Sequence, residues 1–264
     1  MKIANEYNHL NAREFLIVNK SSQYDEIRNS IISIDANKYL KLSYDVAKWG
    51  KVFYSQAHLN SAIKEKLYAA AWHDMRIDYY VTGDENTTRD IINVLDKNEQ
   101  RSIIKSHGYD YFPTYNQVDY LKDKIAVEVQ FGKYFSVAYD LHVKHTFFYS
   151  RSDIDVGVEV IPTKAMEEHM DTGVPWFENE VTNVIREGRT NPPVPILILG
   201  IEPDDILSDE PTDFSDDDLI RIIRNSDLKK LKSKMIDIMS KKRRSDAIVT
   251  RIEKISRCIN IMES

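Results

Sequence analysis

Residues 117–134 read QVDYLKDKIAVEVQFGKY, and this stretch decides what kind of fold the chain adopts. Two strand-like runs, Asn116–Leu121 and Ile125–Phe131, flank the polar tripeptide Lys122–Lys124. A short polar connection between two strand-forming runs is typical of a β-hairpin. The sequence therefore predicts two adjacent antiparallel strands at this point of the chain.

This hairpin brings acidic side chains together. Successive residues of a strand face opposite sides of the sheet, so Glu128 and Gln130 share one face, while the apolar residues between and beside them face the other. Asp119 lies on the neighbouring strand, and the short turn brings it close to Glu128. Two carboxylates suit Mg²⁺, which takes one or two protein carboxylates and keeps several waters. We expect Asp119, Glu128 and the main-chain carbonyl of Val129 to bind Mg²⁺.

Such a metal site indicates phosphodiester hydrolysis. The reaction needs a water aimed at phosphorus and stabilisation of the charge on the phosphate oxygens. Gln130 can hydrogen-bond the attacking water, but an amide is no strong base, so another group has to take up the proton. We expect Asp119, Glu128 and Gln130 to be the catalytic residues, and Lys133 to face a phosphate or a base edge. The alternative is a hairpin face that meets only solvent.

The pattern outside the hairpin predicts further strands that alternate with helices. The additional predicted strands are Met75–Val81, Ile154–Ile161 and the apolar run Val194–Ile201. The N-terminal third is predicted to be helical. The predicted helices are Tyr24–Ile34, Ser61–His73, Thr87–His107, Tyr134–Tyr149 and Thr163–Arg186, the last broken near Gly173 and Pro175. The predicted fold class is α/β, with a mixed central sheet flanked by helices and with helical N- and C-terminal additions.

Charge divides the chain into two regions. The stretch Glu202–Asp218 has nine acidic and no basic residues, whereas residues 219–264 have 13 basic and 5 acidic residues and are predicted to form two helices. We expect a main domain over residues 1–203, followed by an acidic linker and basic C-terminal helices over residues 204–264. The net charge of −6 does not exclude DNA as a partner, because phosphate binding depends on the local surface.

Composition excludes several other classes of protein. No apolar run reaches the roughly 18 residues that span a bilayer, so we expect no membrane partner. The polar residues of Met1–Leu10 argue against an export signal, which favours a cytoplasmic protein. The single cysteine, Cys258, excludes an internal disulfide and a cysteine-rich zinc site, and we expect it to be buried near a helix end.

An aspartate followed nine residues later by Glu-x-Gln resembles the active site of the BglII/BstYI restriction endonucleases, a branch of the PD-(D/E)xK nucleases in which Gln replaces Lys. The resemblance covers about Trp72–Pro203. The family's PD dipeptide is Val118-Asp119 here, which departs from the pattern. Four ordered blocks carry the resemblance: VEVQFGKY, IDVGVEVIP, EVTNVIREGR and NPPVPILILGIEP.

The resemblance implies a restriction-endonuclease-like core and a homodimer in which each subunit cuts one strand of a DNA palindrome with Mg²⁺. It further implies a type II restriction endonuclease of a restriction–modification system, with a recognition site centred on GATC. In the family an upstream helix supplies another polar group near the metal. That helix does not align clearly here, and Glu99 is the candidate we name.

Further residues are candidates for DNA contact. Arg186, Arg189, Thr190 and Asn191 lie where a helix ends and a loop begins, and Thr172 lies in the break before Gly173. Arginine suits guanine or phosphate, and asparagine suits adenine. The alternative is that the cations only stabilise the carboxyl end of the helix.

Three other groups have competing interpretations. Asp155 and Glu159 form a rival acidic pair that we expect to border the metal site or to pair with basic residues. His142 and His145 are three apart on one helix, but they lack further zinc ligands, so we expect a partly exposed structural role. The run Lys241–Arg244 suits phosphates, although a solvated helix face explains it as well.

Other functions fit part of this pattern. A repair or mobile-element nuclease would use the same chemistry, and a neighbouring methyltransferase gene would distinguish it from a restriction enzyme. A catalytically silent DNA-binding module would bind DNA without Mg²⁺-dependent cutting. A protein-interaction scaffold, which the acidic stretch favours, would bind no DNA even at low salt.

Overall fold

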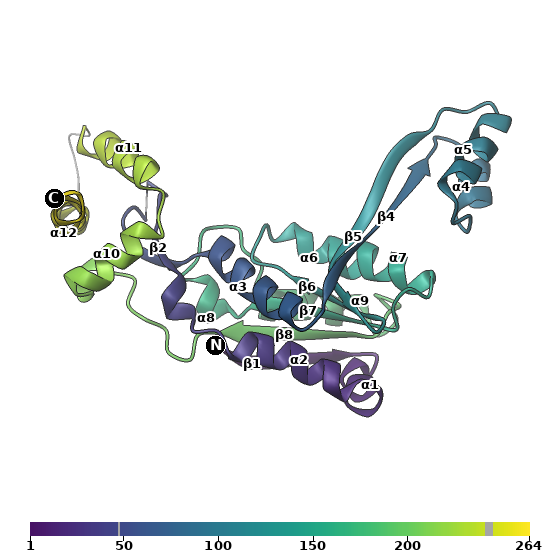
Figure 1. Cartoon of the computed structure of the whole chain (residues 1–264), viewed down its shortest axis with the longest axis horizontal. Helices are drawn as coiled ribbons and strands as arrows, with labels where there is room; N and C mark the ends of the chain where they lie inside the picture. Colours follow the sequence, from purple (N-terminus) through teal and green to yellow (C-terminus); the bar gives the residue numbers. More distant parts are fainter. Residues whose placement is uncertain (47, 241–244) are drawn as a thin grey trace.

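The computed structural model describes residues 1–46, 48–240 and 245–264. Its centre is a six-stranded sheet in the order β1-β8-β7-β6-β5-β4 (Figure 1). Strands β6, β7 and β8 are parallel, while β1, β5 and β4 pair antiparallel to their neighbours. The predicted mixed α/β sheet is therefore confirmed. The strands are β1 (Lys2–His9), β4 (His73–Val81), β5 (Phe112–Lys122), β6 (Ile125–Val129), β7 (Val156–Pro162) and β8 (Ile196–Glu202).

Helices cover both faces of this sheet. On one face, the valines of β6 and β7 pack in one buried cluster with apolar residues of three N-terminal helices. On the other face, two smaller clusters join the sheet to the helices that follow β6 and β7. The first set is α1 (Ala12–Asn19), α2 (Ser21–Ile32) and α3 (Gln56–Ala69), and the second set is α6 (Phe135–Tyr139), the π-helical segment η2 (Asp140–Lys144), α7 (His145–Ser150) and α9 (Phe177–Glu187).

The predicted hairpin forms between β5 and β6. Asp123 and Lys124 both have positive φ, at 48° and 65°. Two consecutive residues with positive φ make the kind of tight turn whose twist matches the twist of the flanking strands. The turn therefore fixes the register Tyr120↔Val127, on which the arrangement of the acidic residues depends.

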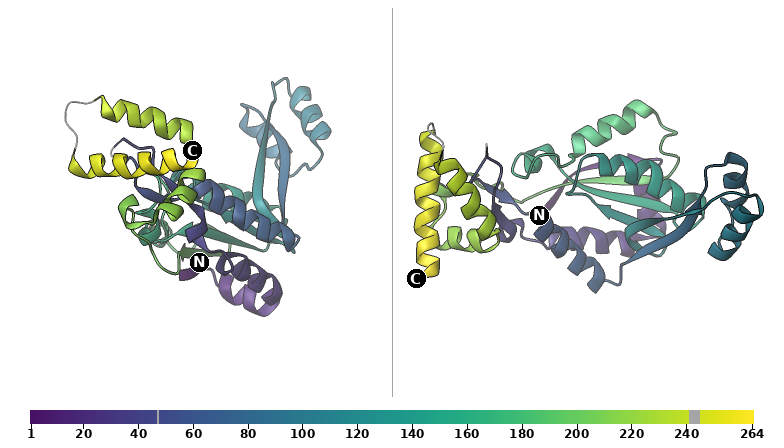
Figure 2. Two further views of the ribbon diagram at one scale, coloured as in Figure 1. Left: turned by 60° about the vertical axis from the view of Figure 1, so that its left-hand side comes forward. Right: turned by 90° about the horizontal axis from the view of Figure 1, so that it is seen from above.

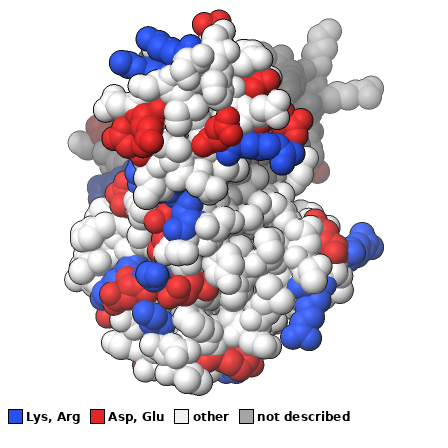
Figure 3. All heavy atoms as spheres, turned by 90° about the vertical axis from the view of Figure 1, so that its right-hand side faces the viewer, with Lys and Arg blue, Asp and Glu red and all other residues white. Residues whose placement is uncertain are grey.

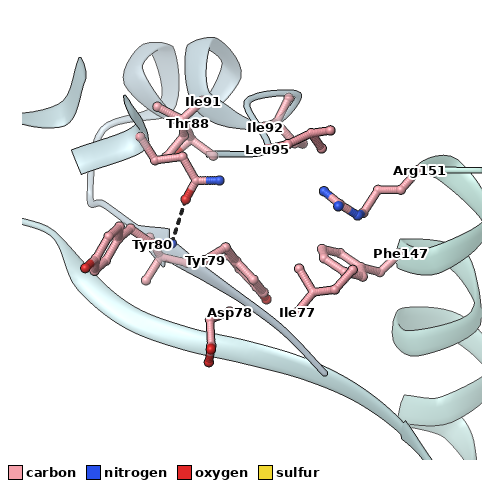
Figure 4. A pocket seen from close by; sticks show the side chains of 12 residues that line it. Ile77, Asp78, Tyr79, Tyr80, Thr88, Ile91, Ile92, Leu95, Phe147 and Arg151 are labelled. Carbon is pink, nitrogen blue, oxygen red and sulfur yellow. Dashed lines mark hydrogen bonds between the residues drawn. The ribbon is translucent and has the colours of Figure 1, made fainter. Parts of the chain in front are cut away.

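Strands β4 and β5 continue beyond the sheet as an arm (Figure 1). The arm ends in two short helices, α4 (Glu85–Ile91) and α5 (Lys97–Ser106). An apolar hollow of about 200 Å³ separates this tip from α7 (Figure 4). Phe147 of α7 stacks on Tyr79 of β4 at 5.4 Å between ring centroids, so aromatic packing links the arm to the core.

A second helical group lies at the opposite end of the molecule from the arm (Figure 2). Its helices share the large apolar cluster with buried Trp49 and Leu42. Arg251 forms an ion pair with Glu210 at 2.6 Å. The group contains α10 (Asp216–Arg224), α11 (Leu228–Met239), α12 (Asp246–Glu263), the small sheet of β2 (Leu40–Leu42) and β3 (Val52–Tyr54), and the 3-10 helices η1 (Ala36–Tyr39) and η3 (Pro211–Asp213).

The structure corrects three details of the sequence prediction. The N-terminal third begins with edge strand β1, because residues 2–9 pair with the apolar strand β8, a partner that periodicity cannot reveal. The predicted helix Thr87–His107 is divided into α4 and α5. The described C-terminal residues form three helices where two were predicted.

Cys258 and the run Lys241–Arg244 both belong to the C-terminal region of the chain. Cys258 is buried in α12, as expected. The run Lys241–Arg244 lies outside the described residues. Among the residues that the structure describes, no helix has the length and apolar character needed to cross a membrane.

Gly200 in β8 allows α9 to pack closely on the sheet. A Cβ atom at this position would lie 2.8 Å from Cγ of Phe177. We expect Gly200→Ala to lower the free energy of unfolding by about 1–3 kcal/mol, because the aromatic ring has to move within a packed core. Urea unfolding measures this loss. Gly83→Ala is the matched control, since nothing lies within 4 Å of its new methyl group, and equal losses in the two variants would contradict the packing argument.

Candidate active site

Three acidic residues lie side by side on one face of three adjacent strands. Asp119 of β5 lies beside Glu128 of β6, because its carboxylate accepts a hydrogen bond from the main chain of β6 at Val129 and its charge acts on Glu128. The parallel register then pairs Glu128 with Glu159 of β7. Paired residues of neighbouring strands project to the same face. The hairpin and the first crossover therefore create a row of carboxylates across the sheet.

The three carboxylates differ in their access to solvent. Asp119 is partly exposed, and its Oδ2 accepts a hydrogen bond from the main-chain N–H of Val129 at 3.4 Å. Glu128 and Glu159 are both fully buried. Asp119 therefore lies at the open side of the row.

The helix that follows β6 adds a second layer of charged groups. Nζ of Lys144 lies 3.1 Å from Oε2 of Glu128 and 2.7 Å from Oδ1 of Asp140. The other carboxylate oxygen of Asp140 accepts a hydrogen bond from Nε2 of Gln130 at 2.5 Å. Glu128, Lys144, Asp140 and Gln130 are thus connected in one chain of contacts.

A π-helical turn supplies the two helical members of this network. Asp140 and Lys144 are the first and last residues of η2. Such wide turns are rare and often occur at functional sites. This one lies between α6 and α7, directly above the carboxylates of the sheet.

Glu159 is enclosed by the same helix. Its Oε2 lies 3.3 Å from Nε2 of His145, and both side chains are completely buried. Gly157, two residues earlier on the same face, makes room for the imidazole, since a Cβ there would lie 2.7 Å from Nδ1 of His145. His145 is therefore a buried structural partner of Glu159, whereas we had expected a partly exposed side chain.

Burial dominates the electrostatics of the row. It raises the pKa of Glu128 well above the ordinary value, and the charges of Asp119 and Asp140 raise it further, while Lys144 opposes them. Burial also raises the pKa of Asp140. For Lys144, burial acts to lower the pKa, but Glu128 and Asp140 outweigh it and the net shift is upward. Raised pKa values show that these carboxyls hold protons tightly, and a bound cation would favour their charged forms.

The donor set fits a hard divalent cation. Oε1 of Glu128 is buried and has no hydrogen-bond partner, which is costly unless another group binds it. Within the described residues, no three Asp, Glu, His or Cys side chains are grouped so that they could hold a metal ion. Asp119, Glu128 and the carbonyl of Val129 would therefore need water or phosphate oxygens to complete the coordination, as is usual for Mg²⁺.

Two of the predicted DNA-contact residues lie together near this site. Lys133 and Thr172 line one hollow of about 400 Å³, to which Gln56 at the start of α3 also contributes. A main-chain hydrogen bond from Tyr134 to the carbonyl of Gly173, 2.7 Å long, joins the two loops. Both loops lie at the carboxyl ends of the parallel strands, where open α/β sheets commonly bind ligands.

The other predicted contact residues form a separate group. Arg186 lies in the last turn of α9 and Arg189 follows its end, and both are exposed. Arg189 lines a different hollow, beside residues 7–11. Thr190 is exposed, and Asn191 donates to Glu187 at 3.1 Å. Because α9 returns to the start of β8, this group lies toward the amino ends of the parallel strands, away from Lys133.

The structure separates other candidates from the metal site. Glu99 lies on α5 at the tip of the arm, where its N–H is capped by Asp96, so it is not the upstream residue that we expected near the metal. Asp155 precedes β7 and lies 3.9 Å from Lys124 at the hairpin turn. Glu159, in contrast, does border the site.

Sequence reasoning missed Asp140 and Lys144. Their spacing of four residues is common in helices and carries no sign of a site. The only available signal was their place in the helix directly after the Glu-x-Gln strand. The register of that helix against the sheet, which brings Lys144 to Glu128 and Asp140 to Gln130, is set by tertiary packing.

Comparison with known proteins identifies the family. The family model of the restriction endonucleases BglII and BglIII matches residues 4–201. The chain belongs to the BglII/BglIII restriction endonuclease family. It is therefore a type II restriction endonuclease, a site-specific deoxyribonuclease, as the sequence resemblance implied. No curated protein sequence is significantly similar to it.

Solved structures support the same fold. The crystal structure of BglII bound to a DNA 16-mer matches with a TM-score of 0.52 and 16% sequence identity, over 77% of this chain and 78% of that chain. The structure of free BglII matches with a TM-score of 0.48 and 17% identity, over 77% and 81%. The first match extends the restriction-endonuclease fold to this chain.

The buried Glu159 makes the stability of this enzyme depend on pH. Burial raises its pKa well above the ordinary value of 4.5, so the folded protein keeps a proton that the unfolded chain releases above about that pH. Its stabilising contribution is complete at low pH and declines as the pH rises toward the folded pKa. Glu159→Gln keeps the size of the side chain and has no proton to lose.

We expect Glu159→Gln to gain free energy of unfolding relative to the wild type as the pH rises. The difference between the two proteins should be larger at pH 8 than at pH 4.5, because only the wild type has to release or retain a buried proton in this range. Burial and Lys144 lower the pKa of His145 to about 3, so the folded wild type keeps this imidazole neutral at both pH values. Urea unfolding at the two pH values measures the difference, and a pH-independent difference would refute the buried-proton argument.

Proposed function

We propose that this restriction endonuclease hydrolyses phosphodiester bonds of double-stranded DNA with Mg²⁺ at a short palindromic site, as a homodimer. The observation that carries the proposal is the pair of carboxylates at the end of the β5–β6 hairpin, one partly exposed and one buried with an oxygen that has no hydrogen-bond partner. The known relatives centre their sites on GATC, and we propose the same core for this enzyme.

The residues divide the chemistry among them. Asp119, Glu128 and the carbonyl of Val129 would hold Mg²⁺, which supplies Lewis acidity and neutralises charge on the scissile phosphate. Gln130 holds the attacking water in line with phosphorus. The water oxygen bonds to phosphorus and passes one proton to a phosphate oxygen, the bond from phosphorus to the leaving sugar oxygen breaks, and the leaving oxygen takes up that proton. Lys144 and the backbone keep the carboxylates in place before DNA arrives.

DNA contact is proposed for both groups of predicted residues. Lys133 and Thr172 are placed to meet the backbone beside the scissile phosphate, because their hollow adjoins the strand that carries Glu128. Arg186, Arg189, Thr190 and Asn191 would meet DNA farther from that phosphate. The arm side of the molecule carries interspersed acidic and basic side chains (Figure 3), so contact with phosphates is expected to depend on such local groups.

Dimer symmetry accounts for a palindromic site. Each subunit has one set of Asp119, Glu128 and Gln130, so cutting both strands at once requires two copies related by a two-fold axis. We propose residues 1–203 as the endonuclease domain and residues 204–264 as an addition of acidic linker and basic helices. The family model ends at residue 201, close to this boundary.

Replacing Asp119 tests the metal site. We expect Asp119→Asn to reduce Mg²⁺-dependent cleavage of plasmid DNA by at least about 100-fold, because an amide binds Mg²⁺ poorly and removes one of two carboxylates. Binding of a duplex without metal should be retained. Sequencing the ends of the wild-type fragments gives the recognition site and the stagger. Unchanged digestion by Asp119→Asn would show that the carboxylate pair is not the catalytic centre.

Replacing Lys133 tests the DNA-facing hollow. We expect Lys133→Ala to weaken duplex binding and to reduce the slope of log affinity against log salt by about 1, as for the loss of one phosphate contact. Fluorescence anisotropy over a range of salt concentrations measures both. Lys2→Ala is the control, because Lys2 is already paired with Glu202 at 3.1 Å. Identical salt slopes for wild type and Lys133→Ala would exclude this contact.

A further inference from the structure

The amide of Gln130 has a defined orientation in this site. Its Nε2 donates to Oδ2 of Asp140, so its Oε1 is turned away from Asp140. A Cβ atom at Gly132 would lie 3.4 Å from that oxygen, so the absence of a side chain at residue 132 leaves space beside it. The oxygen of the amide is therefore the end that a water or substrate can reach.

This orientation has chemical consequences. An amide presents a hydrogen-bond acceptor at one end and a donor at the other, and a rotation of 180° exchanges them. A water that attacks phosphorus must give up a proton, so it is aligned best by an acceptor. The same Gln130 with its NH₂ group toward the water would donate to the water oxygen and compete for the lone pair that has to attack.

Asp140 determines which end of the amide faces the site. An ionised carboxylate accepts hydrogen bonds and donates none, so it selects the NH₂ end of Gln130. Lys144 holds this carboxylate from the other side, at 2.7 Å from Oδ1. Asp140 is only 1% exposed, so water cannot easily take over either contact. The same ammonium lies 3.1 Å from Glu128, which links the orienting group to the metal-binding carboxylate.

We propose that Asp140, held by Lys144, is a positioning residue that fixes the amide of Gln130 with its oxygen toward the attacking water. This inference rests on the proposed function, because it assigns a role within the same hydrolytic site. It explains why two charged helical residues are buried over the carboxylate row. It also explains how the amide of Gln130, which could otherwise rotate, keeps the orientation that aligns the attacking water.

The variant Asp140→Asn inverts the orientation. The ammonium of Lys144 requires an acceptor, so it takes the amide oxygen of Asn at position 140 and leaves the NH₂ group facing Gln130. Gln130 then has to present its oxygen to position 140 and its NH₂ group to the water. We expect kcat to fall by about 10–100-fold while KM for DNA stays within about 2-fold.

The double variant Gln130→Glu with Asp140→Asn restores the pattern. The carboxylate of Glu at position 130 accepts from the NH₂ group at position 140, and its second oxygen again offers an acceptor to the water. The total charge of the site equals that of the wild type. We expect kcat to return to within about 10-fold of wild type, which a purely structural role of Asp140 would not predict.

A double-mutant cycle separates action through Gln130 from other effects. If Asp140 acts through Gln130, Asp140→Asn should lower kcat by less than about 3-fold in a Gln130→Ala background, because no amide is left to orient. Asp153→Asn is the control for loss of a carboxylate near the end of the same helix, where Asp153 pairs with Arg151 at 2.9 Å. It should leave cleavage unchanged.

Three measurements without cleavage accompany the kinetics. Mn²⁺ binding followed by electron paramagnetic resonance, duplex binding without metal and the thermal midpoint should be similar in Asp140→Asn and wild type. If the single variant does not fold, the charge-conserving double variant and Gln130→Ala carry the test. Wild-type rates in Asp140→Asn, full additivity in the cycle, or no rescue in the double variant would each overturn the inference.

Failure of the proposed function gives a different result. In that case the wild-type protein would not cut DNA with Mg²⁺, and Asp119→Asn would show the same absence of cleavage. The positioning role would then fall as well. If wild type cuts and Asp119→Asn does not, the function stands, and the response of Asp140→Asn alone decides the inference.

Discussion

The structure depends on burying a carboxylate of Glu128 in the middle of a sheet. Moving one ion out of water costs several kcal/mol even after the protein relaxes. Lys144 offsets part of this cost through contacts with Glu128 and Asp140, but Oε1 of Glu128 keeps no partner. The buried row is therefore electrostatically incomplete, and the divalent cation that we propose for this site would offset that deficit.

This constraint accounts for the layers around the row. The helical segment after β6 has to bring a cation to the sheet, so it lies close enough that Gly157 is needed under His145. The opposite face carries the uninterrupted valine cluster that anchors the same strands. A rigid apolar layer on one side and a charged layer on the other hold the carboxylates in fixed positions before substrate binds.

The arm and the C-terminal helices lie at opposite ends of the molecule, with the central sheet and its acidic residues between them (Figures 1 and 2). The tip of the arm contains Glu99, so the insertion between β4 and β5 contributes no ligand from that position. The C-terminal helices instead complete an apolar cluster around Trp49. In this chain the β5–β6 hairpin thus lies in a core that carries additional elements at both ends.

The sequence by itself determined the hairpin, most of the central strands and the family, because alternation of side chains and the spacing of Asp119, Glu128 and Gln130 are local properties. Only the tertiary structure decided that β1 joins the sheet, that Glu159 lies beside Glu128, that Lys144 meets Glu128 and that Asp140 meets Gln130. These contacts join residues 10 to 200 positions apart, and some depend on how one helix is rotated against the sheet. Packing sets that rotation, and no local pattern of residues records it.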